Sequence, residues 1–408
     1  MVGNYQFKVL MIMIKINGKL THFANPKANR ANIYSDVQRD LISLSKAKDV
    51  IDDIKSWPGY AVTPLHSLTA LAEDVGLASI WYKDESLRFG LKSFKALGGA
   101  YAVARQLQKI VEKKIGKYPT IDNLLKGSFT NQVADVVISC ATDGNHGRSV
   151  AWGAQMFGCQ CIIYVHKDVS PGRKKAMEAF GAEVIQIDGN YDDSVRIAQQ
   201  EAQINGRFIV SDTSYPGYME VPKDVTLGYT VMLSEIVKQL DGDIPTHIFI
   251  QGGVGGVASA IIGYFWDLWG IDRPRFIIVE PEQANCLQLS AKAGQIVAVK
   301  GELTTLMAGL ACGEVSPLAW QILANGADDF MTLSEEAVAD TMRLLAKGNG
   351  GDPAIEAGES AVPGLAVAII ARQQKLFSEA LNLDARSKVL VIGTEGATDN
   401  ELYKQLIS

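Results

Sequence analysis

Short apolar runs alternate with helical patterns from residue 135 onward, and this alternation limits the possible fold more than any other feature. We predict strands at 136–140, 161–165, 183–187 and 208–211, separated by helices at 145–157, 172–180 and 192–204. Such strand–helix–strand repeats form βαβ units, whose parallel sheet is covered by helices on both faces. The pattern therefore predicts an α/β fold for this part of the chain.

The alternation returns toward the C-terminus, with predicted strands at 247–250, 276–279 and 389–392 and helices such as 334–347 and 364–372. A chain of 408 residues is long enough for two domains. We therefore expect two lobes, each a mainly parallel twisted sheet flanked by helices, with a cleft between them. Residues 113–133 break the pattern, and we expect a surface excursion there.

Net charge and hydropathy exclude some classes of binding partner for this chain. The chain has 39 Lys and Arg against 45 Asp and Glu, a net charge of -6, which argues against nucleic acid or an anionic membrane. No apolar run approaches the length of a membrane span. The apolar run 7–14 is short and is followed by Lys15 and Lys19, so we interpret it as a strand, or as an extended start upstream of Met11 or Met13, and not as a signal peptide. We expect a cytoplasmic protein.

A glycine-rich loop follows the predicted strand 247–250 and opens a helix. Four of the five residues 252–256 are glycine, so several backbone N–H groups can converge on one anion, and the helix dipole favours a phosphate there. A tight turn rarely needs so many glycines. Val257 and Ala258 do not fit a P-loop, and the run does not match the dinucleotide pattern GxGxxG, so a kinase or dehydrogenase is excluded.

Two further turns follow predicted strands. The first holds Asp143, Asn145 and His146 at the C-terminal edge of a parallel sheet, where α/β folds bind ligands. An Asx turn with a helix cap would also explain Asp143–Gly144. The second turn holds Thr394, whose hydroxyl could meet a heterocyclic nitrogen, although a helix cap explains this residue as well.

Lys95 follows Ser93 and Phe94 and precedes small residues, and we predict that it lies one turn inside a helix. Small neighbours would let a flat ring bonded to the lysine approach closely. Burial would remove part of the charge of the amine and make it a nucleophile. The surroundings of Lys95 therefore suggest a covalent role, which depends on the three loops described above.

No metal site is expected, because neither the cysteines nor the histidines have metal-ligand spacing. Cys286 and Cys312 lie in or near loops, and a cytosolic setting disfavours a bridge between them. We interpret Lys83 and Glu85 as structural residues.

The motifs 93–95, 144–147, 252–256 and 394–396 resemble, in this order and spacing, the fold-type II enzymes that use pyridoxal 5'-phosphate, the tryptophan synthase β-like family. The resemblance spans about residues 63–399. It implies a larger cofactor-binding domain of residues 1–110 and 215–408, a smaller domain of residues 111–214, and an active site in the cleft between them. Relatives are usually homodimers.

The resemblance also implies roles for individual residues. Lys95 would bond covalently to the cofactor, Asn145 would contact its 3'-oxygen, and Thr394 would meet its ring nitrogen. Apart from the resemblance, we expect Gln251 and Glu280 to line the cofactor site and His146 to support a neighbouring residue. The phosphate would be held by Gly252, Gly253, Val254, Gly255 and Gly256.

Dehydratases of this family usually carry a small residue where this chain carries Asp143. The segments 95–101, 142–147, 212–218 and 308–313 are instead similar to the diaminopropionate ammonia-lyases, and some of these have cysteines at the places of Cys286 and Cys312.

This resemblance implies elimination on D- and L-2,3-diaminopropionate, giving pyruvate and ammonia. The expected catalytic residues are Lys95, Asp143 and Asp212. The two aspartates suit this substrate because carboxylates attract its two ammonium groups. Asp143 would be the base on the face opposite Lys95, whereas ordering of a loop explains Asp212 nearly as well. The alternatives are a serine/threonine or D-serine dehydratase, a β-replacement transferase such as cysteine synthase, and a non-catalytic regulator that keeps the fold.

Overall fold

The computed structural model describes residues 14–142 and 144–408, so most of the apolar run 7–14, with Met11 and Met13, lies outside the described residues, as does Asp143. The strands form two sheets. The larger has the order β1-β10-β9-β8-β11-β3-β2. Its strands are β1 (Leu20–Ala24), β2 (Leu65–Ser67), β3 (Ser79–Asp84), β8 (His247–Gln251), β9 (Arg275–Pro281), β10 (Asp329–Leu333) and β11 (Lys388–Gly393).

The smaller sheet has the order β6-β5-β4-β7, and all its pairs are parallel. Its strands are β4 (Val137–Ala141), β5 (Gln160–Val165), β6 (Glu183–Gln186) and β7 (Phe208–Ile209). Among the described strands of the larger sheet, only the outer pairs β1–β10 and β2–β3 are antiparallel. The expected α/β fold with mainly parallel sheets is thus confirmed, although β1, β2, β3 and β10 were not predicted.

Both faces of the larger sheet are buried. Along β8, Ile248 and Ile250 pack into one hydrophobic cluster, whereas Phe249 between them packs into the other with Leu365 and Ile369. This alternation follows from the period of two in a strand, which points successive side chains to opposite faces. A continuous apolar strand such as β8 is therefore stable only between two layers of helices.

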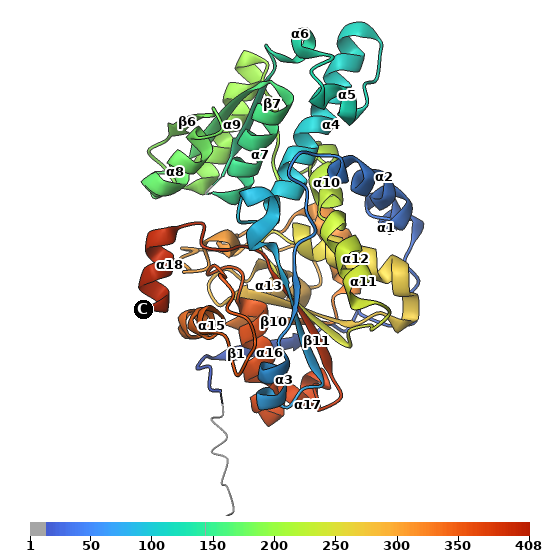
Figure 1. Cartoon of the computed structure of the whole chain (residues 1–408), viewed down its shortest axis with the longest axis vertical. Helices are drawn as coiled ribbons and strands as arrows, with labels where there is room; N and C mark the ends of the chain where they lie inside the picture. Colours follow the sequence, from blue (N-terminus) through green and yellow to red (C-terminus); the bar gives the residue numbers. More distant parts are fainter. Residues whose placement is uncertain (1–13, 143) are drawn as a thin grey trace, which may run out of the picture.

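Figure 1 shows the smaller sheet with its helices as a lobe beside the rest of the molecule, and α4 running between the two parts. The α-helices are α1 (Asp36–Leu41), α2 (Leu44–Lys55), α3 (Thr69–Val75), α4 (Lys95–Ile115), α5 (Ile121–Leu125), α6 (Thr130–Val133), α7 (Asn145–Phe157), α8 (Pro171–Glu178), α9 (Tyr191–Asn205), α10 (Glu220–Gly228), α11 (Thr230–Leu240), α12 (Gly256–Trp269), α13 (Cys286–Ala293), α14 (Pro317–Gly326), α15 (Glu336–Lys347), α16 (Pro363–Gln373), α17 (Lys375–Leu381) and α18 (Asn400–Ile407). Short 3₁₀ helices are η1 (Glu85–Gly90), η2 (Gly270–Asp272) and η3 (Ala308–Leu310).

The stretch 113–133 is not a plain surface excursion. It contains the end of α4 and the short helices α5 and α6, and it buries Ile121, Leu124 and Phe129. These apolar side chains pack against the main core, which explains why a polar, glycine-containing stretch is ordered. Within the described residues, the helices are too short or too polar to cross a membrane.

Candidate active site

Lys95 is the first residue of α4, and not one turn inside it as predicted. The segment before Lys95 is bonded to the turn that follows β11. The Phe94 N–H donates to the carbonyl oxygen of Thr394 at 3.1 Å, and the Gly396 N–H donates to that of Lys92 at 2.9 Å. These bonds bring Lys95 and Thr394, which are distant in sequence, to the same place.

Lys95 forms an ion pair with Asp212, which lies in the loop after β7. Burial disfavours the charge on Lys95, but the Asp212 carboxylate outweighs it and raises the pKa of Lys95 above its usual value. Burial likewise opposes the charge on Asp212, yet Lys95 and His146 hold the pKa of Asp212 below its usual range. The expectation that burial would discharge the amine is therefore wrong for this structure, because it omitted the partner.

The small residues after Lys95 serve helix packing. A Cβ atom on Gly98 would lie 2.5 Å from Cε1 of Tyr229, and one on Gly99 would lie 2.6 Å from Oγ of Ser149. The ring that approaches this part of α4 is thus the phenol of Tyr229, a contact that nothing in the sequence indicated.

The glycine-rich loop lies between β8 and α12, as predicted. Gly253 and Gly255 have φ angles of 60° and 97°, a region that favours glycine. A Cβ atom on Gly252 would lie 2.7 Å from Cγ of Glu280, and one on Gly256 would lie 3.7 Å from the carbonyl oxygen of Asp212. The loop therefore adjoins the Lys95–Asp212 pair.

The donors of this loop suit a phosphate group. Gly256 and Val257 begin α12, so their N–H groups have no acceptor within the helix, and the helix dipole adds partial positive charge. The residues present therefore fit a phosphate group.

Asn145 is the first residue of α7, and its side-chain amide donates to the Glu395 carboxylate in the turn after β11. Its neighbour His146 contacts the carbonyl oxygen of Val210 through Nε2 at 2.8 Å, and its Nδ1 lies 3.9 Å from Oδ2 of Asp212. His146 thus supports Asp212. The contact of Asn145 with a cofactor oxygen stays a prediction.

Thr394 is buried and donates its hydroxyl to the carbonyl oxygen of Ser360 at 3.2 Å. To donate to a ring nitrogen, the hydroxyl must turn away from Ser360, so this role also stays a prediction. The expected base Asp143 lies outside the described residues.

Glu280 and Gln251 both lie next to the glycine-rich loop and bond the backbone around it. Glu280 accepts hydrogen bonds from the N–H groups of Leu287 and Gln288, each at 2.8 Å, and so caps the start of α13. The side-chain amide of Gln251 donates to two backbone carbonyl groups at 2.8 Å each. In the part of the chain that the structure describes, no disulfide joins Cys286 to Cys312, and the Cys286 thiol donates to the carbonyl oxygen of Gly253 at 3.6 Å.

Two buried carboxyl groups, Glu359 and Glu395, were not recognised from the sequence. Burial and then the neighbouring Glu395 raise the pKa of Glu359 to about 8. Arg173 of α8 lies 3.2 Å from the Glu359 carboxylate and so links the smaller sheet's helices to the larger lobe. Glu395 stands beside Thr394 in a turn already singled out, but nothing in the sequence indicated its contact with Asn145.

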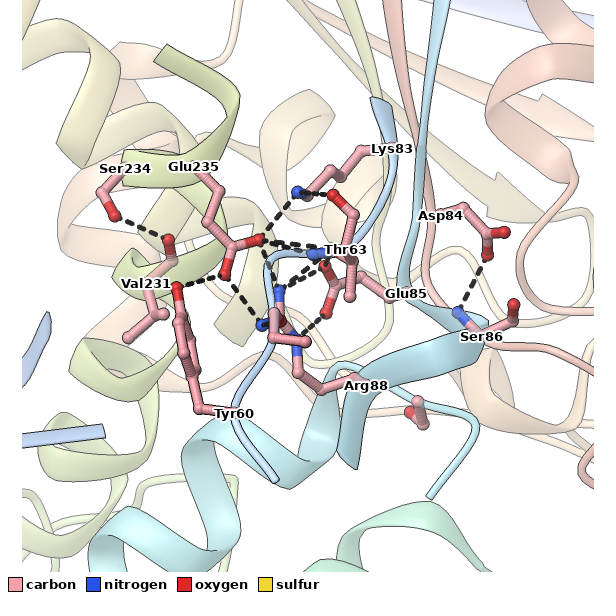
Figure 2. A network of polar contacts seen from close by, with 12 residues as sticks. Tyr60, Thr63, Lys83, Asp84, Glu85, Ser86, Arg88, Val231, Ser234 and Glu235 are labelled. Atoms are coloured by element: carbon pink, nitrogen blue, oxygen red, sulfur yellow. Dashed lines mark hydrogen bonds and ion pairs between the residues drawn. The ribbon is translucent and has the colours of Figure 1, made fainter. Parts of the chain in front are cut away.

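Next to the segment that leads to Lys95 lies a buried network of charges, shown in Figure 2. The Glu235 carboxylate of α11 faces Arg88 at 2.8 Å, Lys83 at 2.7 Å and the Tyr60 hydroxyl at 2.9 Å. Glu85 pairs with the same Arg88 at 2.8 Å. Two carboxylates thus balance two cations, which agrees with the structural interpretation of Lys83 and Glu85.

The described residues contain no group of three or more His, Cys, Asp or Glu side chains placed to hold a metal ion.

Comparison with known proteins extends these observations. Residues 57–394 match the family described as pyridoxal-phosphate dependent enzymes. A diaminopropionate ammonia-lyase of Escherichia coli K12 is 41% identical over 90% of this chain and 92% of its own length. One from Salmonella typhimurium is 38% identical over 90% and 93%.

A crystal structure of the Escherichia coli enzyme in complex with D-serine matches with a TM-score of 0.87 and 38% identity, covering 96% of this chain and 97% of that one. The chain therefore belongs to the family of pyridoxal-phosphate dependent enzymes and, within it, to the diaminopropionate ammonia-lyases.

Proposed function

We propose that this enzyme converts 2,3-diaminopropionate and one water into pyruvate and two molecules of ammonia. The observation that carries the proposal is the 41% identity with a diaminopropionate ammonia-lyase over 90% of the chain. The lysine–aspartate pair beside the glycine-rich loop supports it, because a cationic substrate with two amino groups suits a site that holds carboxylates.

The residues that would hold pyridoxal phosphate are Lys95 at its aldehyde carbon, Asn145 at its 3'-oxygen, Thr394 at its ring nitrogen, and residues 252–256 at its phosphate. When bound, the cofactor supplies an electron sink for the carbanion formed beside the substrate carboxylate. Thr394 suits this chemistry since a neutral hydroxyl, unlike a carboxylate, leaves the ring nitrogen unprotonated.

Lys95, held by Asp212, would take a proton from the substrate and later donate one, both on the same side of the substrate. Asp212 stabilises the ammonium form of Lys95, so that Lys95 can hold a proton taken from the substrate carbon. The β-amino group must leave as ammonia and needs a proton to do so. A protonated Lys95 is a donor suited to that step.

On sequence grounds alone, we propose Asp143 as the base on the opposite side. Bases on two sides would explain use of both the D- and the L-substrate. The Asp143→Asn enzyme should then lose activity on the D-substrate by about 100-fold or more while retaining part of its activity on the L-substrate. Full activity on the D-substrate would remove this role.

The test of the function is pyruvate formation from D- and L-2,3-diaminopropionate, measured beside D- and L-serine under the same conditions. The expected result is a kcat/KM for diaminopropionate that exceeds that for serine by at least tenfold. Faster elimination from serine or threonine would instead identify a dehydratase.

The two sheets also support the division into domains. The strands of the smaller sheet lie within 111–214 and those of the larger within 1–110 and 215–408, so we propose these as the two domains, with the active site between them.

We further propose a cytoplasmic homodimer. Ile33 and Val37 are 83% and 67% exposed beside a groove of about 510 Å³, and exposed apolar side chains of this kind mark association surfaces. Light scattering during gel filtration measures the mass directly.

A further inference from the structure

The Tyr229 side chain lies beside the Lys95–Asp212 pair. The residue is 1% exposed, and its hydroxyl makes no hydrogen bond of ordinary geometry with the described residues, only a looser one with Lys95. Burial raises the pKa of Tyr229, whereas the nearby Lys95 ammonium lowers it and Asp212 raises it again. A buried hydroxyl without such a bond is costly, so its place beside these two charged groups needs an explanation.

The position of the phenol is set by close packing of α10 against α4. A Cβ atom on Gly228 would lie 2.4 Å from the carbonyl oxygen of Leu97, so only glycine allows the backbones to approach this closely. The ring of Tyr229, the next residue, then occupies the space beside Gly98 and packs on Phe94 with 4.7 Å between ring centroids. Phe94 directly precedes Lys95, and Gly98 lies one turn after it in α4, so the packing of the ring on both residues holds the hydroxyl near the lysine amine.

We propose that Tyr229 is a positioning residue for Lys95, whose hydroxyl together with Asp212 forms a seat for the lysine amine whenever that amine is not bonded to the cofactor. The inference rests on the covalent role of Lys95 in the proposed function. In that role Lys95 would be released from the cofactor in every turnover, so its free amine would have to be held in place and later return.

The hydroxyl adds a property that Asp212 lacks. A carboxylate only accepts hydrogen bonds, so it binds the ammonium form of Lys95 and has nothing to donate to the neutral amine. A phenol hydroxyl both accepts and donates. Tyr229 can therefore accept from the ammonium and donate to the lone pair of the neutral amine. It would keep Lys95 in place in the protonation state in which the amine attacks a carbon atom.

The test uses the Tyr229→Phe enzyme, because phenylalanine keeps the ring between Phe94 and Gly98. Cofactor-free enzyme is mixed with pyridoxal phosphate, and the covalent bond to Lys95 is followed by absorbance; the amine attacks the aldehyde carbon and water leaves. The expected bond formation is about tenfold slower, with unchanged affinity for the phosphate-bearing cofactor. In turnover, kcat falls by a similar factor while KM is unchanged.

The matched control is Tyr101→Phe. Tyr101 is also a buried tyrosine, 4% exposed on α4, and the groups that act on its pKa after burial, which are Arg105, Asp53, Asp224 and Tyr118, do not include Lys95 or Asp212. The Tyr101→Phe enzyme should form the covalent bond to the cofactor at the wild-type rate. A second variant, Gly98→Ala, keeps the hydroxyl but displaces the ring, and should slow bond formation as Tyr229→Phe does.

Bond formation at the wild-type rate in Tyr229→Phe overturns the inference, as does equal slowing in Tyr101→Phe. Because bond formation needs no substrate, this result is independent of the substrate test. If the wild-type enzyme has no activity on diaminopropionate, the proposed substrate is refuted, but the inference about Tyr229 and Lys95 is unaffected.

Discussion

Lys95 and Asp212 form an ion pair that joins the first residue of α4 to the loop after β7, across 117 positions of sequence. α4 packs against α7 of the smaller sheet and α10 of the larger lobe, while β7 belongs to the smaller sheet. The protonation of Lys95 therefore depends on the position of the smaller sheet relative to the larger lobe, because this position sets the contact with Asp212.

Lys95→Ala should abolish the covalent bond to the cofactor and lower kcat by about 1,000-fold or more, because the variant has no amine at the site. Borohydride reduction followed by mass spectrometry of peptides checks this. The control Lys126→Ala removes an exposed lysine that pairs with Asp122, and this variant should be labelled at Lys95 like the wild type. Labelling of another lysine in Lys95→Ala would contradict the assignment.

Asp212→Asn should lower the pKa of Lys95, because it removes the group that raises this pKa and leaves burial, which lowers it. In cofactor-free enzyme, an amine-reactive reagent should then modify Lys95 at a pH at least one unit lower than in the wild type. Asp224→Asn, which affects the pairs with Arg105 and Lys109, is the control and should leave the profile unchanged. An unchanged profile in Asp212→Asn would exclude this coupling.

Glu235→Gln should destabilise the fold by about 3–5 kcal/mol at pH 7, because it leaves the buried Lys83 and Arg88 with one carboxylate fewer. Burial opposes the charge on Glu235, but Arg88 and Lys83 outweigh it and lower its pKa to about 2. The wild type should therefore lose this contribution as the pH falls from about 4.5 to about 2, and the variant should not.

Urea unfolding measured across this pH range tests the Glu235 prediction. Asp122→Asn breaks an exposed pair and should change the unfolding free energy by no more than about 0.5 kcal/mol. Equal effects of the two substitutions would show that the buried network does not stabilise the fold.

Glu280 predicts the opposite pH dependence. Burial raises its pKa to about 8, so the folded protein keeps a proton that the unfolded chain releases above about pH 4.5. The unfolding free energy should fall as the pH rises from about 4.5 to about 8, by about 1.4 kcal/mol per pH unit from this one proton. In Glu280→Gln the unfolding free energy should decline less steeply over this pH range, by the contribution of about one proton. Parallel slopes in the two proteins would refute the shift.

Much of the fold was predictable because its signals are local. The strands of the smaller sheet and the helices between them lie close to the predicted ranges, and Asn145 begins its helix as expected. β1 and β2 were missed since they are short, half-exposed edge strands with no clear alternation. The start of α4 at Lys95 was missed as well, because the turn that ends there is held by bonds to Thr394 and Gly396, far along the chain.

The sequence by itself determined the α/β alternation, the glycine-rich loop and the lysine, because strand and helix periodicity and glycine conformations are properties of neighbouring residues. Only the tertiary structure decided the charge on Lys95, the pairing of Lys95 with Asp212 and the place of the Tyr229 phenol beside them. Asp212 and Tyr229 reach the lysine from other segments. The electrostatic interaction between two groups depends on their distance in space and on their burial, neither of which can be read from spacing along the chain.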